Sequence, residues 1–97
     1  MKIQTVIAGF FKLDGGAMFG VIPKRMWENF YPADSRNLCT WAMRSLLIET
    51  GERRILIDTG IGNKQDDKFR SHFEPTSVPN IAKWLSEHKL STESITD

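Results

Sequence analysis

Residues 38–62 constrain the fold of this chain more than any other stretch, and they read LCTWAMRSLLIETGERRILIDTGIG. Residues 38–50 have the two-residue periodicity of a β-strand, and toward the end of this run both faces are apolar, which favours a strand covered on both sides. Gly51-Glu52 is a turn signal, and residues 54–58 return as a short apolar strand. The segment therefore predicts two strands that are joined by a tight turn and followed by a glycine-rich loop.

A second pair of strands is predicted near the N-terminus. Residues 3–11 begin with alternating side chains and continue into two phenylalanines, which is typical of a strand. The Asp-Gly-Gly sequence at residues 14–16 is a strong turn signal, because glycine adopts positive φ without steric cost. Residues 18–22 are a short apolar run that Pro23 ends. Together these features predict an antiparallel hairpin.

The remaining chain predicts one long loop and then helices. Residues 24–37 have loop composition, with one helical turn around Met26 and Trp27, and a loop of this length is uncommon in a compact domain unless it is functional. The predicted helices cover residues 64–71, a segment capped by Ser77 with Pro79 in its first turn, and a last turn over residues 91–95 that Ser91 caps. The fold class is therefore α+β, with an antiparallel or mixed sheet followed by helices.

Composition excludes several classes of function. The 13 basic and 12 acidic residues give a net charge of +1 with no block of like charge, which argues against nucleic acid as a partner. No apolar stretch is long enough to cross a bilayer, and the N-terminus lacks the pattern of a signal peptide. The single cysteine, Cys39, excludes an intramolecular disulfide and fits a reducing compartment. We expect a cytoplasmic chain with no membrane contact.

Several motifs along the chain occur in a characteristic order and spacing. They are D-G-G-A-M-F-G at residues 14–20, P-A-D at 32–34, T-W-A-M-R at 40–44, I-D-T-G at 57–60 and I-T-D at 95–97. In this order they resemble the N-terminal portion of metallo-β-lactamase-fold hydrolases, and the first motif resembles the lactonase-like branch of that superfamily.

The resemblance implies an αββα sandwich, of which residues 1–97 form a single partial domain at the N-terminal end. It also implies hydrolysis of a small ester or lactone-like substrate with two zinc ions as cofactors, while phosphodiesters and thioesters stay open as substrates. The family's H-x-H-x-D-H motif would follow the final I-T-D and lie outside this chain. An intact parent is thus expected to be an enzyme, whereas these residues alone are expected to hold no catalytic group and no metal ligand.

Asp58, Thr59 and Gly60 are the first candidate site residues. An acid at the end of a buried strand must find hydrogen-bond donors, since an unpaired buried carboxylate is costly, and the following amides and the Thr59 hydroxyl are available. From the residues alone, a turn that ends the strand is the favoured interpretation. The resemblance implies a structural role for the three residues beneath a metal site, without Asp58 being a metal ligand.

The second candidate is an apolar substrate pocket. The resemblance implies that the loop at residues 14–20 overhangs the active site, where Met18 and Phe19 offer a flexible and a flat apolar surface. Trp27, with Phe30 and Tyr31, is predicted to be either a lid over this pocket or an aromatic plug that holds the long loop down. The alternative for Met18 and Phe19 is that they fill the core of the first hairpin.

We predict structural roles for the two histidines and the cysteine. His72 and His88 lie far apart and lack the short spacing that places two zinc ligands on one element, so we expect neither to bind a metal. Cys39 lies in the middle of a predicted strand and is expected to be a small core residue.

These observations leave three functions from different classes. The first is the N-terminal portion of a zinc-dependent hydrolase that acts on a small molecule. The second is the non-catalytic half of a split protein, whose apolar hairpin face docks on the remainder of the fold or on a complementing chain. The third is an independent small module that binds an apolar ligand at Met18, Phe19, Trp27 and Tyr31.

Overall fold

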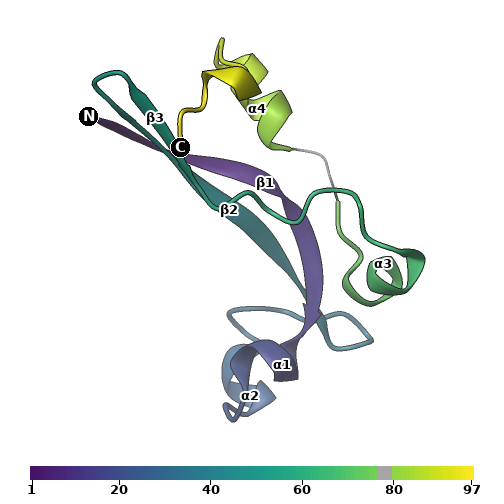
Figure 1. The fold of residues 1–97 in the computed structure, drawn as a ribbon. Helices are drawn as coiled ribbons and strands as arrows, with labels where there is room; N and C mark the ends of the chain where they lie inside the picture. Colours follow the sequence, from purple (N-terminus) through teal and green to yellow (C-terminus); the bar gives the residue numbers. More distant parts are fainter. Residues whose placement is uncertain (77–79) are drawn as a thin grey trace.

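A three-stranded antiparallel sheet in the order β1-β2-β3 is the centre of the molecule (Figure 1). The computed structural model describes residues 1–76 and 80–97. Strand β1 spans Lys2–Asp14, β2 spans Leu38–Thr50 and β3 spans Arg53–Ile57. The two long strands pair along their whole length, so β1 and β2 form a long curved ribbon, with the short β3 beside one end of it.

The predicted hairpin of residues 38–58 is confirmed. Strand β2 has the predicted bounds, and the register Thr50↔Arg53 leaves Gly51 and Glu52 as a two-residue turn. Gly51 has a φ of 56°, a left-handed value that glycine adopts readily and that tight hairpin turns require. Local turn chemistry and period-two alternation therefore agree with the observed strands.

The predicted N-terminal hairpin is wrong. Strand β1 continues to Asp14 and pairs with β2 instead, whereas residues 18–22 form no strand. Asp14 begins the short helix α1 (Gly15–Phe19), because its Oδ1 accepts a hydrogen bond from the Gly16 backbone N–H at 2.7 Å. The Asp-Gly-Gly sequence is thus a helix cap, and the long β2 strand supplies the partner that β1 needs.

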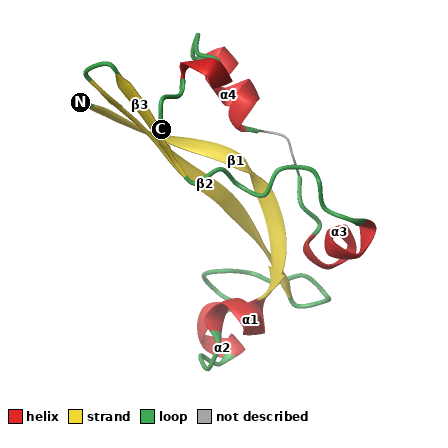
Figure 2. Cartoon of the chain, in the orientation of Figure 1, coloured by secondary structure: helices red, strands yellow, loops and turns green. Residues whose placement is uncertain are grey.

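Short helices connect and cover the strands (Figure 2). Helix α2 (Lys24–Trp27) confirms the predicted helical turn, and α3 (Asp67–Phe73) begins later than predicted, after the cap Asp66. Helix α4 (Ile81–Glu87) is capped by Asn80, and the predicted cap at Ser77 with Pro79 lies outside the described residues. The 3-10 turn η1 (Thr92–Ser94) follows Ser91, as predicted.

Helix α4 builds the hydrophobic core on one face of the sheet. Val6, Leu47 and Leu85 are fully buried, each 0% exposed, and Ile81 and Trp84 of α4 pack around them. Val6 and Leu47 come from neighbouring strands and Leu85 from the helix, so this small cluster joins the two layers. We call this side of the sheet the covered face.

The opposite side of the sheet, which we call the open face, carries exposed aliphatic side chains. Leu46 is 40% exposed, although its neighbour Leu47 is 0% exposed on the covered face. Ile3 and Ile57, which lie on the same side as Leu46, are 58% and 48% exposed. The prediction that β2 is covered on both sides is therefore wrong for the described part of the chain, because α4 covers one face only.

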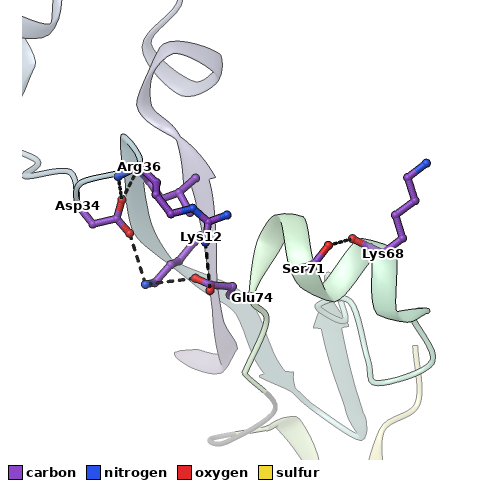
Figure 3. Close-up of polar contacts among 7 residues, drawn as sticks. Lys12, Asp34, Arg36, Lys68, Ser71 and Glu74 are labelled. Carbon is purple, nitrogen blue, oxygen red and sulfur yellow. Dashed lines mark hydrogen bonds and ion pairs between the residues drawn. The ribbon is translucent and has the colours of Figure 1, made fainter.

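Ion pairs fasten the long loop and helix α3 to the end of β1. Lys12 Nζ lies 3.7 Å from Asp34 Oδ2 and 3.3 Å from Glu74 Oε2, and Arg36 Nη1 lies 4.0 Å from Glu74 Oε1 (Figure 3). Asp34 also accepts hydrogen bonds from the backbone N–H groups of Leu38 and Arg36, which lowers the pKa of its carboxyl. Asp34 therefore fixes the chain just before β2 begins.

The outer edge of β3 is bound by the last two residues. Leu56 N–H donates to the Asp97 carbonyl at 2.8 Å, and Thr96 N–H donates to the Arg54 carbonyl at 2.8 Å. Arg53 holds the Asp97 carboxylate through its Nη2 at 2.6 Å and its Nε at 3.1 Å. Within residues 1–76 and 80–97, no helix is long and apolar enough to cross a membrane.

Acidification to pH 2 is expected to loosen this edge. The hydrogen bonds from Arg53 and then Thr96 lower the pKa of Asp97 from 3.8 to about 2. A carboxyl group with a lowered folded-state pKa stabilises the fold above its unfolded pKa, and that contribution is lost as the pH falls through the folded value. We expect the protection factor of the Leu56 amide, the ratio of its intrinsic to its observed exchange rate at the same pH, to be lower at pH 2 than at pH 5, measured by NMR.

The matched variants are Arg53→Ala and Arg25→Ala. The first should return the pKa of Asp97 toward 3.8, whereas the second, which removes an arginine elsewhere, should leave it near 2. An Asp97 titration that is the same in both variants would show that the Arg53 pair does not hold the edge.

Candidate functional site

A hydrogen bond to the Asp58 side chain closes the loop that follows β3. Asp58 has a φ of 70°, and its Oδ1 accepts a hydrogen bond from the Gly60 backbone N–H at 3.0 Å. One of the predicted donors, a following amide, is therefore present. The carboxylate is exposed, however, so the premise that Asp58 is a buried acid is wrong for the described residues. A role beneath a metal site stays a prediction for Asp58, Thr59 and Gly60.

Gly60 brings this loop across the covered face to β1. An added Cβ at Gly60 would lie 3.0 Å from the Ala8 Cβ and 3.9 Å from the Met43 Sδ, and Gly60 has a φ of 69°. Both the left-handed backbone and the close approach favour glycine at this position. Ala8 lies where the β1–β2 register shifts, between Ile7 and Gly9, so the loop rests on a β-bulge.

A cavity of about 370 Å³ lies between this loop and helix α4. Thr59 is the one predicted site residue among those that line it. The described lining residues are Ala8, Thr59, Gly62, Asn63, Asn80, Ile81 and Ala82.

The predicted pocket residues lie in a second group, an aromatic cluster of Phe19, Trp27, Tyr31 and Trp41. Phe19 stacks on Trp27 with ring centroids 4.7 Å apart, and Tyr31 stacks on Trp41 at 4.2 Å. Phe19 also lies 5.7 Å from Trp41, which joins the two stacks. Trp27 is 5% exposed, so this side chain packs as a plug between α1 and α2.

Apolar side chains surround the aromatic cluster and face solvent. Met18 is 40% exposed, Met26 is 64% exposed and Phe30 is 85% exposed, whereas Phe19 is half-buried in the stack. The sequence predicted Met18 and Phe19 as equivalent pocket residues, but Met18 is the more accessible of the two. Val21 and Ile22, which sequence reasoning assigned to a strand, are exposed at the same end of the molecule.

Strand β2 places the two candidate groups next to each other. Met43 lies close to Gly60, and Trp41 of the aromatic cluster is two residues away on the same face of β2. Sequence reasoning missed Trp41, although its alternation with Cys39 and Met43 placed all three side chains on one face. The predicted site residues thus form two adjoining groups on the covered face rather than one pocket.

The histidines and Cys39 occupy structural positions. His88 stacks on Trp84 with ring centroids 3.7 Å apart, and one of its ring nitrogens lies 2.8 Å from the Trp84 carbonyl oxygen. His72 lies on α3 beside Phe73. Cys39 is buried, as predicted, and burial raises the pKa of its thiol.

The described residues bring few potential metal ligands together. Across residues 1–76 and 80–97, no three or more His, Cys, Asp or Glu side chains are grouped so that they could hold one. Asp58 is the first residue of the loop after β3, and its Oδ1 accepts the hydrogen bond from Gly60 N–H that closes the turn. A metal that acts beside this loop would need ligands from residues outside the described chain.

Comparison with solved structures finds a close match to part of a longer protein. A probable metal-dependent hydrolase from Staphylococcus aureus is 35% identical to this chain and superposes with a TM-score of 0.87. The match covers 97% of this chain and 34% of that protein, so the chain spans about a third of the length of its structural relative. No family model matches the sequence, and no curated protein matches it significantly. The chain therefore has the fold of about a third of a probable metal-dependent hydrolase.

Proposed function

We propose that this chain forms the N-terminal portion of a metal-dependent hydrolase, in which it supplies a sheet and part of the wall around the reaction site. The observation that carries the proposal is the similarity to the S. aureus protein, with 35% identity and a TM-score of 0.87 over 97% of this chain. Because the chain spans 34% of that protein, the catalytic activity belongs to the larger fold. The metal ligands come from residues outside this chain.

The proposed fold of the whole is the αββα sandwich of metallo-β-lactamase-type hydrolases. Its support is the order of the D-G-G-A-M-F-G and I-D-T-G motifs and the strand pairing of the region between them. In such a hydrolase two zinc ions supply Lewis-acid activation of a carbonyl group. A cytoplasmic location remains a prediction from the single buried cysteine.

The residues of this chain shape and position the site. The hydrogen bond from Gly60 N–H to Asp58 fixes the loop after β3, and the contact of Gly60 with Ala8 seats that loop on the sheet. The aromatic cluster supports the adjoining apolar surface, where Met18 is exposed. This surface suits the apolar part of a small ester or lactone-like substrate.

A second candidate function is an independent module that binds an apolar ligand. The exposed side chains around the aromatic cluster favour it, since Val21 is 100% and Phe30 is 85% exposed. Metal content, measured on the larger protein, separates the two functions, because a hydrolase of the larger fold binds metal and an apolar-ligand module does not.

A chimeric protein tests the hydrolase proposal. This chain replaces the matched third of the S. aureus hydrolase, and zinc content is measured by mass spectrometry together with hydrolysis of lactone and ester substrates. We expect about two zinc ions per chain and hydrolysis comparable to that of the S. aureus parent. A chimera that folds and binds zinc but hydrolyses no substrate cleaved by the parent would contradict the proposal.

The substrate class is tested in the same chimera with Met18→Ala. If Met18 lines the substrate surface, this change should raise KM several-fold for a lactone with a long acyl chain and leave KM for a short-chain lactone unchanged. Val21→Ala is the matched control, because Val21 is a fully exposed aliphatic residue close to Met18 in the sequence. If Met18→Ala leaves the KM for the long-chain lactone as it is in the unchanged chimera, Met18 does not line the pocket.

A further inference from the structure

The backbone of the loop after β3 is held by hydrogen bonds from side chains. Three alternate carbonyl oxygens, those of Ile61, Asn63 and Gln65, each accept one. Arg70 of α3 donates two of these bonds, from Nη2 to Asn63 at 2.8 Å and from Nε to Gln65 at 3.2 Å. The side-chain amide of Gln65 donates the third, to Ile61. One guanidinium group therefore ties the loop to α3.

The conformation of the loop explains why side chains supply these donors. Asp58, Gly60 and Gly62 have φ values of 70°, 69° and 66°, so every second residue at the start of the loop is left-handed. A backbone of this kind continues neither a helix nor a strand, and residues 58–66 form neither. Carbonyl groups without a ladder partner must accept from water or from side chains. Arg70 meets this need at two of them.

The Arg70 guanidinium is committed to the loop. Asp66 and Glu74 cap the two ends of α3, yet among residues 1–76 and 80–97 the Arg70 side chain forms an ion pair with neither. Glu74 pairs with Lys12 and Arg36 instead (Figure 3). Nε and Nη2 lie on one edge of the planar guanidinium group, so this edge meets two carbonyl oxygens at once, which a lysine ammonium cannot do in the same fixed geometry.

The loop that Arg70 holds forms one wall of the cavity. Asn63 accepts its hydrogen bond from Arg70, and Asn63, Gly62 and Thr59 all line the cavity of about 370 Å³. Gly60 seats the beginning of the loop on β1 through its contact with the strand. Arg70 is therefore the anchor at the far end of the wall, where the loop enters α3.

We infer that Arg70 is a positioning residue of the proposed hydrolase, which fixes the loop of residues 58–66 against α3 and so sets the shape of the site beside it. The kinetic consequence rests on the proposed function, whereas the hold of Arg70 on the loop does not. Arg70 acts through the loop backbone, and the edge of its guanidinium carries the effect more than its charge does. Its loss should therefore lower kcat more than it raises KM.

The first test measures the loop in this chain by NMR. In the unchanged protein the backbone amides of residues 61–65 should have order parameters of about 0.85, as in a rigid backbone. Arg70→Ala and Arg70→Lys should each lower them to below about 0.6, because neither side chain can hold both carbonyls. The amides of Val6, Leu47 and Leu85 should keep their chemical shifts, since the core is not changed.

Lys68→Ala is the matched control, because Lys68 is a cation of the same helix whose side chain extends away from the other labelled residues (Figure 3). It should leave the order parameters of residues 61–65 unchanged. Rigid loop amides in Arg70→Ala, or a loop that Arg70→Lys holds as firmly as arginine does, would overturn the inference. The lysine variant keeps the charge and the helix propensity, so it decides the question even if the alanine variant does not fold.

The second test uses the chimera in which this chain replaces the matched third of the S. aureus hydrolase. With zinc content unchanged, Arg70→Lys should lower kcat about tenfold and change KM by less than about twofold. A kcat equal to that of the unchanged chimera would overturn the positioning role. If the unchanged chimera itself binds zinc and hydrolyses nothing, the hydrolase proposal fails, and the order parameters of the first test still decide whether Arg70 holds the loop.

Discussion

Replacing Leu47 with alanine is expected to lower the free energy of unfolding by about 2–5 kcal/mol, the usual cost of such a truncation in a packed core. Leu47 is 0% exposed and is the β2 residue of the core cluster, where it packs with Val6 and Leu85. The cluster is small, so few other side chains are available to fill the cavity that the truncation leaves. A loss of this size is a large part of the total stability of a small domain.

The measurement is urea unfolding followed by far-UV circular dichroism, with Leu46→Ala as the matched control. Leu46 is the adjacent residue of the same strand, but it is 40% exposed on the open face. Its truncation should cost less than about 1 kcal/mol in the isolated chain, because much of its surface is already in water. If the two variants lose equal stability, the open face is covered in solution and the assignment of the two faces is wrong.

The hairpin of β2 and β3 could be predicted because its signals are local. The alternation over residues 38–50 and the turn at Gly51 act within a few residues of each other, and no distant segment changes their meaning. The N-terminal hairpin was wrong because the Asp-Gly-Gly signal at residues 14–16 has two structural uses. A side-chain oxygen of Asp14 that binds the Gly16 N–H can begin a turn or cap a helix, and the distant strand β2 decides between them.

The arrangement of the candidate site could not be predicted from the sequence, and the role of its residues in binding a substrate stays a prediction. Of the predicted pocket residues, Phe19 and Trp27 are neighbours, because α1 and α2 bring the two rings together. Sequence reasoning could not separate the exposed Met18 from the buried Trp27, because the burial of Trp27 depends on how α2 packs over Gly15 of α1. The burial of Asp58 was wrongly predicted, because an apolar strand was assumed to be covered at its end.

Gly15→Ala is expected to disrupt the aromatic cluster. A Cβ at Gly15 would lie 2.2 Å from Cη2 and 2.6 Å from Cζ2 of Trp27, so the indole ring must move. Alanine favours a helix over glycine by about 1 kcal/mol, whereas forcing an extra methyl group into a packed site costs about 1–3 kcal/mol. Since the clash is with a ring that is stacked on Phe19, we expect the steric cost to exceed the helical gain.

The readouts are the near-UV circular dichroism of the tryptophans and the free energy of unfolding. Gly16→Ala is the matched control in the same helix, because its Cβ would lie 3.0 Å from Asp14 Oδ1 and touch no ring. Trp27→Leu in the Gly15→Ala background removes the clashing ring atoms and should recover part of the stability, although Trp27→Leu alone is destabilising. If Gly15→Ala leaves both readouts unchanged, the Trp27 ring does not pack over Gly15. If Trp27→Leu restores stability in the Gly15→Ala background, the missing side chain at Gly15 makes room for the Trp27 ring. That ring in turn supports Phe19 and the adjoining apolar surface.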